Sequence, residues 1–114
     1  MIEHWVKPLD RDKVFSGLQL EDFHLGNNIH LYEDRVPDLN AAQIVILGID
    51  EENAAPVRRE LYRCSHCFGQ SNIVDLGNIR NKDNSFIIPL LSELIQLGIT
   101  PVILGEQSYQ FRAP

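Results

Sequence analysis

The feature of this sequence that most limits its fold is a set of three short apolar runs, each ending in a polar or glycine-containing segment. The runs are Gln43-Ile-Val-Ile-Leu-Gly-Ile-Asp50, Asn72-Ile-Val-Asp-Leu-Gly77 and Thr100-Pro-Val-Ile-Leu-Gly-Glu-Gln-Ser108. Segments with helical patterns separate them. This alternation is typical of an open, mainly parallel α/β sheet, whose functional groups gather at the carboxyl ends of the strands. We therefore predict an α/β three-layer sandwich fragment with a small, mainly parallel sheet in the order β-α-β-α-β and right-handed crossovers.

The segment between the first two runs predicts a short helix with one apolar face. Pro56 suits the first turn of a helix, so we expect the helix to begin near it. Val57, Leu61 and Cys64 follow helical spacing, and we expect them to face the core. The basic residues of the segment, together with Glu60, then fall mostly on the opposite, solvated face; they are Arg58, Arg59 and Arg63.

A broader apolar stripe predicts a second helix near residues 86–97 that covers one face of the sheet. The stripe comprises Phe86, Ile87, Leu90, Leu91, Leu94, Ile95 and Leu97. Pro89 conflicts with a helix interior because it lacks an N–H group and clashes one turn back, so we place it in or near the first turn. Gly98 is a suitable residue for ending the helix, and Pro101 fits only at the beginning of the third strand.

Residues 1–42 are the least regular part of the chain, because glycines and asparagines interrupt their apolar alternation. We expect a loop-rich N-terminal arm with short helical pieces that packs on the core. One partial α/β domain over residues 43–114 should follow. The length of 114 residues leaves room for one domain, and a hydrophobic content of 44% suffices for a packed core.

Charge and composition exclude several classes of partner. The formal net charge of −6 argues against nucleic acid, since phosphate binding requires clustered Lys and Arg. No apolar run approaches the ~20 residues that span a membrane, and the N-terminus has no signal-peptide pattern. Two cysteines, Cys64 and Cys67, do not make a disulfide framework. We expect a cytoplasmic protein that binds neither nucleic acid nor membrane.

Cys64-Ser-His-Cys67 is the sharpest local pattern, because such a cysteine pair could bind zinc or act in redox chemistry. A structural zinc needs four ligands, and the chain has no second Cys/His pair. His24 and His30 would have to approach from the arm. We therefore interpret Cys64 as packed inward, with His66 and Cys67 in a turn.

Two further patterns have simple structural interpretations. Asp50-Glu51-Glu52 follows the first strand and could hold a cation, but a solvated turn with acidic residues near a helix N-terminus explains it as well. Gly48, Gly77 and Gly105 stand in neither of the glycine-rich phosphate-binding patterns, so we interpret them as backbone turns.

Several stretches, taken in order, are similar to one enzyme family. They are Leu25-Gly-Asn-Asn-Ile-His30, Ile44-Val-Ile-Leu-Gly-Ile-Asp-Glu51, Ala55-Pro-Val-Arg58 with Leu61-Tyr62, Ile73-Val-Asp-Leu-Gly-Asn-Ile79 and Pro101-Val-Ile-Leu-Gly105. Together they resemble the N-terminal third of the ureohydrolase family of arginases, agmatinases and formimidoylglutamases. The bacterial arginase or formimidoylglutamase branch is the nearest. The resemblance spans about residues 24–112 and depends on the combination Ala-Pro-x-x-Arg, Leu-Tyr and Asp-Leu-Gly.

The resemblance implies hydrolysis of a C–N bond in a guanidino or formimidoyl group by a hydroxide that bridges two manganese ions. The family draws metal ligands from a Gly-Gly-x-His element after the third strand and from two Asp-rich elements farther along. Here Ser108 stands at the histidine position, or Gln107 or Glu106 in a shifted register, and the Asp-rich elements are absent. The loop at residues 50–55 is also shorter than the glycine-containing loop typical of the family.

We therefore predict no catalytic, cofactor-binding or metal-ligating residue in this chain and no cofactor of its own. Two functions remain open. In the first, the chain is the N-terminal segment of a ureohydrolase-like hydrolase, inactive alone, with a small-molecule substrate only in a full-length enzyme. In the second, it is a non-catalytic module that acts through protein–protein association. Without the family's later strands, a sheet edge and an apolar face should lack a cover. We expect a homo-oligomer, first a homodimer, unless the arm caps that edge.

Overall fold

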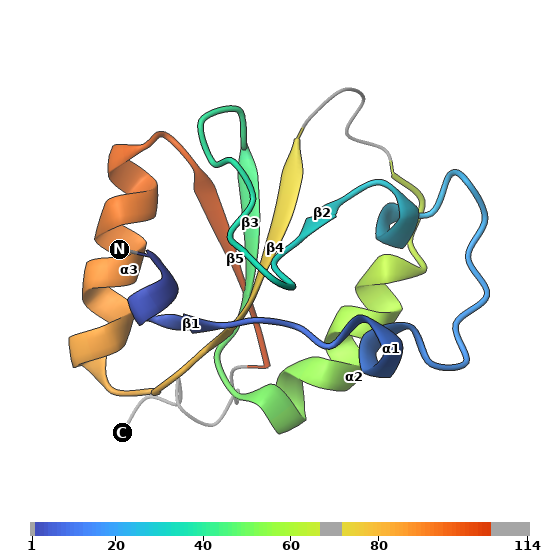
Figure 1. Cartoon of the computed structure of the whole chain (residues 1–114), viewed down its shortest axis with the longest axis horizontal. Helices are drawn as coiled ribbons and strands as arrows, with labels where there is room; N and C mark the ends of the chain where they lie inside the picture. Colours follow the sequence, from blue (N-terminus) through green and yellow to red (C-terminus); the bar gives the residue numbers. More distant parts are fainter. Residues whose placement is uncertain (1, 67–71, 106–114) are drawn as a thin grey trace, which may run out of the picture.

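A computed structural model of the chain describes residues 2–66 and 72–105 and confirms the mixed α/β architecture (Figure 1). Three strands form the parallel part of the sheet: β3 (Ile44–Gly48), β4 (Ile73–Ile79) and β5 (Thr100–Leu104). Strand β3 lies in the centre and pairs with β4 on one side and β5 on the other. The two long helices, which lie on opposite sides of the sheet in Figure 1, are α2 (Glu51–Tyr62) and α3 (Asn84–Gln96).

The N-terminal arm has the predicted loop-rich character with short helical pieces, and it also adds two short strands to the sheet. Strand β1 (Val6–Lys7) pairs antiparallel with the end of β4, and β2 (His30–Leu31) pairs parallel with the first half of β4. The helical pieces are η1 (Ile2–His4), α1 (Arg11–Phe15) and η2 (Leu25–Asn27). Strand β4 extends to Ile79, beyond the apolar run at residues 72–77 that predicted it, and β1 pairs with this extension.

The arm therefore covers the β4 edge of the sheet but does not pair with the β5 edge. The order of the strands along the main path is β1-β4-β3-β5, with β2 pairing with β4. Within residues 2–66 and 72–105, no strand pairs with the outer side of β5. The expectation that the arm could cap an edge is thus correct for one edge only.

Both helices begin earlier than their prolines suggest, and this corrects the predicted boundaries. The carboxylate of Asp50 accepts hydrogen bonds from the backbone N–H groups of Glu52 (3.1 Å) and Asn53 (3.4 Å), so α2 begins directly after β3. Most of the expected loop at residues 50–55 is helix. Pro56 and Pro89 each lie in the second turn of their helix rather than the first. Asp50 and Asp83 cap the two helices with their side chains, and each helix accommodates its proline in the second turn.

The sheet carries an apolar core on each face. On the α3 side, Leu90 and Leu94 are fully buried against Val45, Leu47, Val74 and Leu76. On the α2 side, the core is smaller and comprises Leu25, Ile46, Ala54, Ile73 and Leu104. The predicted stripe of α3 is confirmed at its centre but is too broad, because Ile95 and Leu97 are 63% and 51% exposed.

No helix in the described part of the chain is long and apolar enough to cross a membrane.

Candidate functional site

Two charged side chains meet in the interior, between α2 and the sheet. Arg58 is 2% exposed and Asp75 is completely buried. The Arg58 Nε donates to Asp75 Oδ2 at 2.8 Å, and Nη2 donates to Oδ1 at 3.2 Å. This two-pronged arrangement is the strong geometry for a guanidinium and a carboxylate. Desolvating both charges is costly, so the pair is favourable only if the remaining donors and acceptors are also satisfied.

Neighbouring groups satisfy the pair. The hydroxyl of Tyr62 donates to Asp75 Oδ2 at 2.6 Å, and the backbone N–H of Gly77 donates to Oδ1 at 2.9 Å. Arg58 also donates to the Gly77 carbonyl at 3.0 Å and to Asn78 Oδ1 at 3.1 Å. We call these five residues the Arg58–Asp75 network: Arg58, Tyr62, Asp75, Gly77 and Asn78. Asp75 thus accepts four hydrogen bonds, so its negative charge is well compensated.

The phenol of Tyr62 acts in the network as a hydrogen-bond donor. Burial of the side chain raises the pKa of Tyr62 above its ordinary value, and the negative charge of Asp75 raises it further. The hydroxyl therefore stays protonated at physiological pH. It donates to Oδ2 of Asp75, while the N–H of Gly77 donates to Oδ1.

The network changes the inner face predicted for α2. The buried residues of this helix are Ala54, Arg58 and Tyr62, which follow one another at intervals of four and face the sheet. Of the residues expected to pack inward, Leu61 is partly buried against the smaller core, whereas Val57 is 44% exposed and Cys64 is exposed. The prediction failed at Arg58 because it placed the basic side chains mostly on the solvated face. Asp75 on the sheet instead supplies the counter-charge that lets Arg58 point inward.

Two glycines at strand ends leave space for the network and for the arm. Gly77 has φ of +84°, and a Cβ there would collide with the backbone carbonyl of Lys7 in β1. A Cβ at Gly48 would collide with the side-chain oxygen of Asn78. Both glycines are therefore required by close packing, and both lie within strands rather than in the turns that the sequence suggested.

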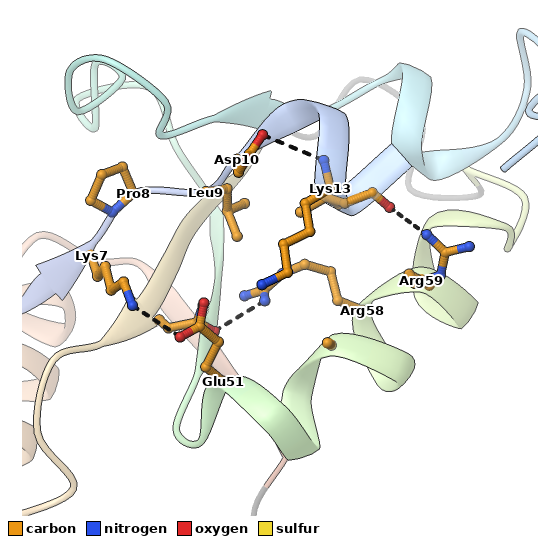
Figure 2. A pocket seen from close by; sticks show the side chains of 11 residues that line it. Lys7, Pro8, Leu9, Asp10, Lys13, Glu51, Arg58 and Arg59 are labelled. Atoms are coloured by element: carbon orange, nitrogen blue, oxygen red, sulfur yellow. Dashed lines mark hydrogen bonds and ion pairs between the residues drawn. The ribbon is translucent and has the colours of Figure 1, made fainter. Parts of the chain in front are cut away.

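A cavity of about 220 Å³ lies beside the network, between the arm and α2 (Figure 2). We call it the arm pocket. Its polar lining comes from the arm, α2 and β4. The arm contributes Lys7, Asp10 and Lys13, α2 contributes Glu51, Arg58 and Arg59, and β4 contributes Asn78. Arg59 also ties α2 to the arm, since its Nη1 donates to the carbonyl of Val14 at 2.9 Å.

The acidic segment at residues 50–52 lies at the N-terminus of α2, which confirms its interpretation as a strand-to-helix turn. Asp50 caps the helix and also contacts Lys82 Nζ at 3.0 Å. This hydrogen bond is the main cause that lowers the pKa of the Asp50 carboxyl. Glu51 forms an ion pair with Lys7 at 3.0 Å. Among the described residues, no three His, Cys, Asp or Glu side chains are grouped so that they could hold a metal ion.

The cysteine segment differs from its interpretation. Cys64 is exposed rather than packed inward, because α2 ends at Tyr62 before reaching it. The arm does reach this segment, since the N–H of Leu25 donates to the Cys64 carbonyl at 2.7 Å and His24 forms an isolated antiparallel β-bridge with Ser65.

The two histidines of the arm have other places in the fold. The Nδ1 of His24 accepts a hydrogen bond from the N–H of Glu21, and His30 is in β2 beside Val74. Cys67 lies outside the described residues, as do Glu106, Gln107 and Ser108.

Comparison with protein-family models, with curated proteins and with solved structures finds no match for this chain.

Sequence reasoning did not predict the Arg58–Asp75 network, although one signal for it was present. Asp75 interrupts a short apolar run that predicts a strand of the parallel sheet. A carboxylate in that position needs a partner, because an unpaired buried charge is very costly. Its partner Arg58 and the donor Tyr62 both lie in the preceding helix, at the spacing that puts them on one face.

Proposed function

We propose that this chain is the N-terminal segment of a ureohydrolase-like hydrolase of C–N bonds in guanidino or formimidoyl groups, inactive as this chain alone. One observation carries the proposal. Arg58, Tyr62, Asp75 and Gly77 all lie in the stretches that carry the sequence resemblance, and they meet in one buried network. Residues that match a family in order and also act as one physical unit support a common origin better than scattered matches.

The strand order supports the same proposal. The chain passes from β3 to β4 on one side and then to β5 on the other, so the direction of winding changes at β3. Open parallel sheets bind ligands at the carboxyl ends of the strands beside such a point. Those ends are Gly48 and Leu104, and residues 106–108, which the resemblance matches to a metal-ligand element, follow β5 directly.

We expect this chain to release no urea or formamide from arginine, agmatine or formimidoylglutamate when manganese is added. The reason is that Ser108 stands at the histidine position and the Asp-rich elements are absent. Asp50 and Glu51, at the end of β3, are moreover engaged by Lys82 and Lys7. The assay compares the folded chain with a protein-free blank. Manganese-dependent turnover above that blank would show that the chain carries its own catalytic residues.

The second candidate, a module that acts by association, is favoured by the geometry of β5. The N–H of Thr100 donates to the Gln43 carbonyl, and the N–H of Ile49 donates to the Leu104 carbonyl, each at 2.9 Å. Alternate residues of a strand direct their backbone groups to opposite sides, so Pro101 and Ile103 direct theirs outward. The outer side of β5 therefore presents hydrogen-bonding groups to a further strand.

Apolar surface lies next to this edge on the α2 side of the sheet. A cavity of about 160 Å³ there is lined by aliphatic side chains only: Leu25, Ile44, Ile46, Leu61, Ile73 and Val102. Val102 is 37% exposed. An added strand would cover these side chains while satisfying the backbone of β5, and strand addition at an open edge is a common mode of association.

We infer that the added strand is β5 of a second copy, paired antiparallel across a two-fold axis at Ile103. In this register the two Ile103 residues exchange both backbone hydrogen bonds. Each Pro101, which has no N–H, then offers its carbonyl to the partner's Gly105. The proline cannot donate in any register. The pairing at Ile103 places Pro101 two residues from the axis, whereas a register shifted by one pair would place it directly beside the axis, opposite Ile103. The position of Pro101 thus favours the symmetric pairing at Ile103.

Light scattering tests this pairing. We expect a concentration-dependent dimer of twice the 13.0 kDa chain mass, and Val102→Lys should leave a monomer because it places a charge on the covered face. The matched control is Ile88→Lys, which changes an equally apolar residue, 59% exposed, on α3 and should leave the dimer intact. A monomer at all concentrations contradicts the pairing. A dimer that only Ile88→Lys disrupts would place the interface on α3 instead.

A further inference from the structure

We propose that the arm pocket binds a small molecule through an anionic oxygen group, either a carboxylate or a phosphate. This proposal does not depend on the hydrolase resemblance. It rests on two donors of lining residues that the protein leaves unused, on a lysine without a counter-charge, and on the size of the cavity.

The first unused donor is the side-chain amide of Asn78. This residue is only 4% exposed, and its Oδ1 accepts from Arg58, which fixes the orientation of the amide. No described residue accepts a hydrogen bond from its Nδ2, although the side chain lines the arm pocket. An amide with one satisfied atom and one free donor, in a side chain that lines a cavity, can contact an acceptor in that cavity.

The second unused donor belongs to Arg58. A guanidinium has five N–H donors, and four of them are used: two by Asp75, one by Gly77 and one by Asn78. The remaining N–H is on Nη1, the same nitrogen that contacts Asn78. Since Arg58 also lines the pocket, its last donor and the amide of Asn78 are available to one ligand.

The charge of the lining favours an anion. Lys7 is paired with Glu51, and Asp10 is engaged in capping α1. Lys13 forms no ion pair with any described residue, and Figure 2 shows its side chain extending into the pocket from the arm. The whole chain carries a formal charge of −6, so a pocket with an unpaired lysine is a local exception that would attract an anion.

The size of the pocket limits the ligand. A volume of 220 Å³ corresponds to roughly seven waters at ~30 Å³ each. This is below the ~300–1,000 Å³ of sites for drug-sized molecules. It suits inorganic phosphate or a short carboxylic acid, and its apolar wall of Pro8, Leu9 and Val14 would contact a short carbon chain.

Titration calorimetry at low ionic strength tests the proposal, with inorganic phosphate and succinate as separate probes. We expect at least one probe to bind, and binding should weaken as sodium chloride is added. Lys13→Gln should weaken binding by about ten-fold, the size expected for one hydrogen bond to a charged group. Asn78→Asp should abolish it, because the carboxylate keeps an acceptor for Arg58 but repels the ligand.

Lys82→Gln is the matched control, since Lys82 is an exposed lysine that does not line the arm pocket. It should leave the affinity unchanged. Phosphate binding without succinate binding, or the reverse, identifies the ligand class. Failure of both probes to bind would overturn the proposal, as would equal weakening by Lys13→Gln and Lys82→Gln. Unfolding curves for each variant show whether a loss of binding reflects a loss of fold.

Discussion

Replacing Asp75 with alanine is expected to lower the free energy of unfolding by about 3–5 kcal/mol, the usual cost of leaving one member of a buried ion pair alone. The substitution leaves the guanidinium of Arg58 at 2% exposure without a counter-charge. It also removes the acceptor of the buried Tyr62 hydroxyl. Small domains have only about 5–15 kcal/mol of stability in total, so this loss is a large share of it.

Urea unfolding measures the effect, and the midpoint should fall while the slope stays the same. The double variant Arg58→Met with Asp75→Ala should lose less than the sum of the two single variants, because no unpaired charge remains. Arg63→Ala is the control. Its partner Glu60 is exposed, and the 3.4 Å contact between them should contribute little. Additive losses in the double variant would show that Arg58 and Asp75 do not depend on each other.

Leu94→Ala is expected to cost about 2–5 kcal/mol, because it removes a side chain from the centre of the larger core and leaves a cavity. Leu94 is completely buried between α3 and the sheet. The next residue provides the matched control, since Ile95 is 63% exposed on the same helix. Ile95→Ala should therefore have a much smaller effect. A cost below about 1 kcal/mol for Leu94→Ala would mean that α3 does not cover the sheet as described.

The two variants examine different parts of the fold, which the sequence reveals to different degrees. Leu94 was predictable, because the apolar stripe of α3 has no charged residue near its centre and periodicity alone identifies its inner face. Arg58 was not predictable in this way. Its inward orientation depends on Asp75, which is 17 residues away in the chain and belongs to another element.

The same distinction applies to the candidate site. The carboxyl ends of the strands were predictable as the place where polar groups gather, and Asp50 and Glu51 do lie there. The arm pocket was not predictable from the sequence, because it forms only where the arm approaches Gly77 and α2. The irregular sequence of residues 1–42 contains no signal for β1 pairing with β4.

The sequence by itself determined the three parallel strands, the inner face of α3 and the position of Pro101 in β5, because these follow from local hydrophobic pattern and backbone restriction. Only the tertiary structure decided which face of α2 is buried, which sheet edge the arm covers and which donors face the arm pocket. Each of these depends on the balance between desolvating a polar group and pairing it with a distant partner. That balance is set when the elements come together, and no local pattern along the chain contains it.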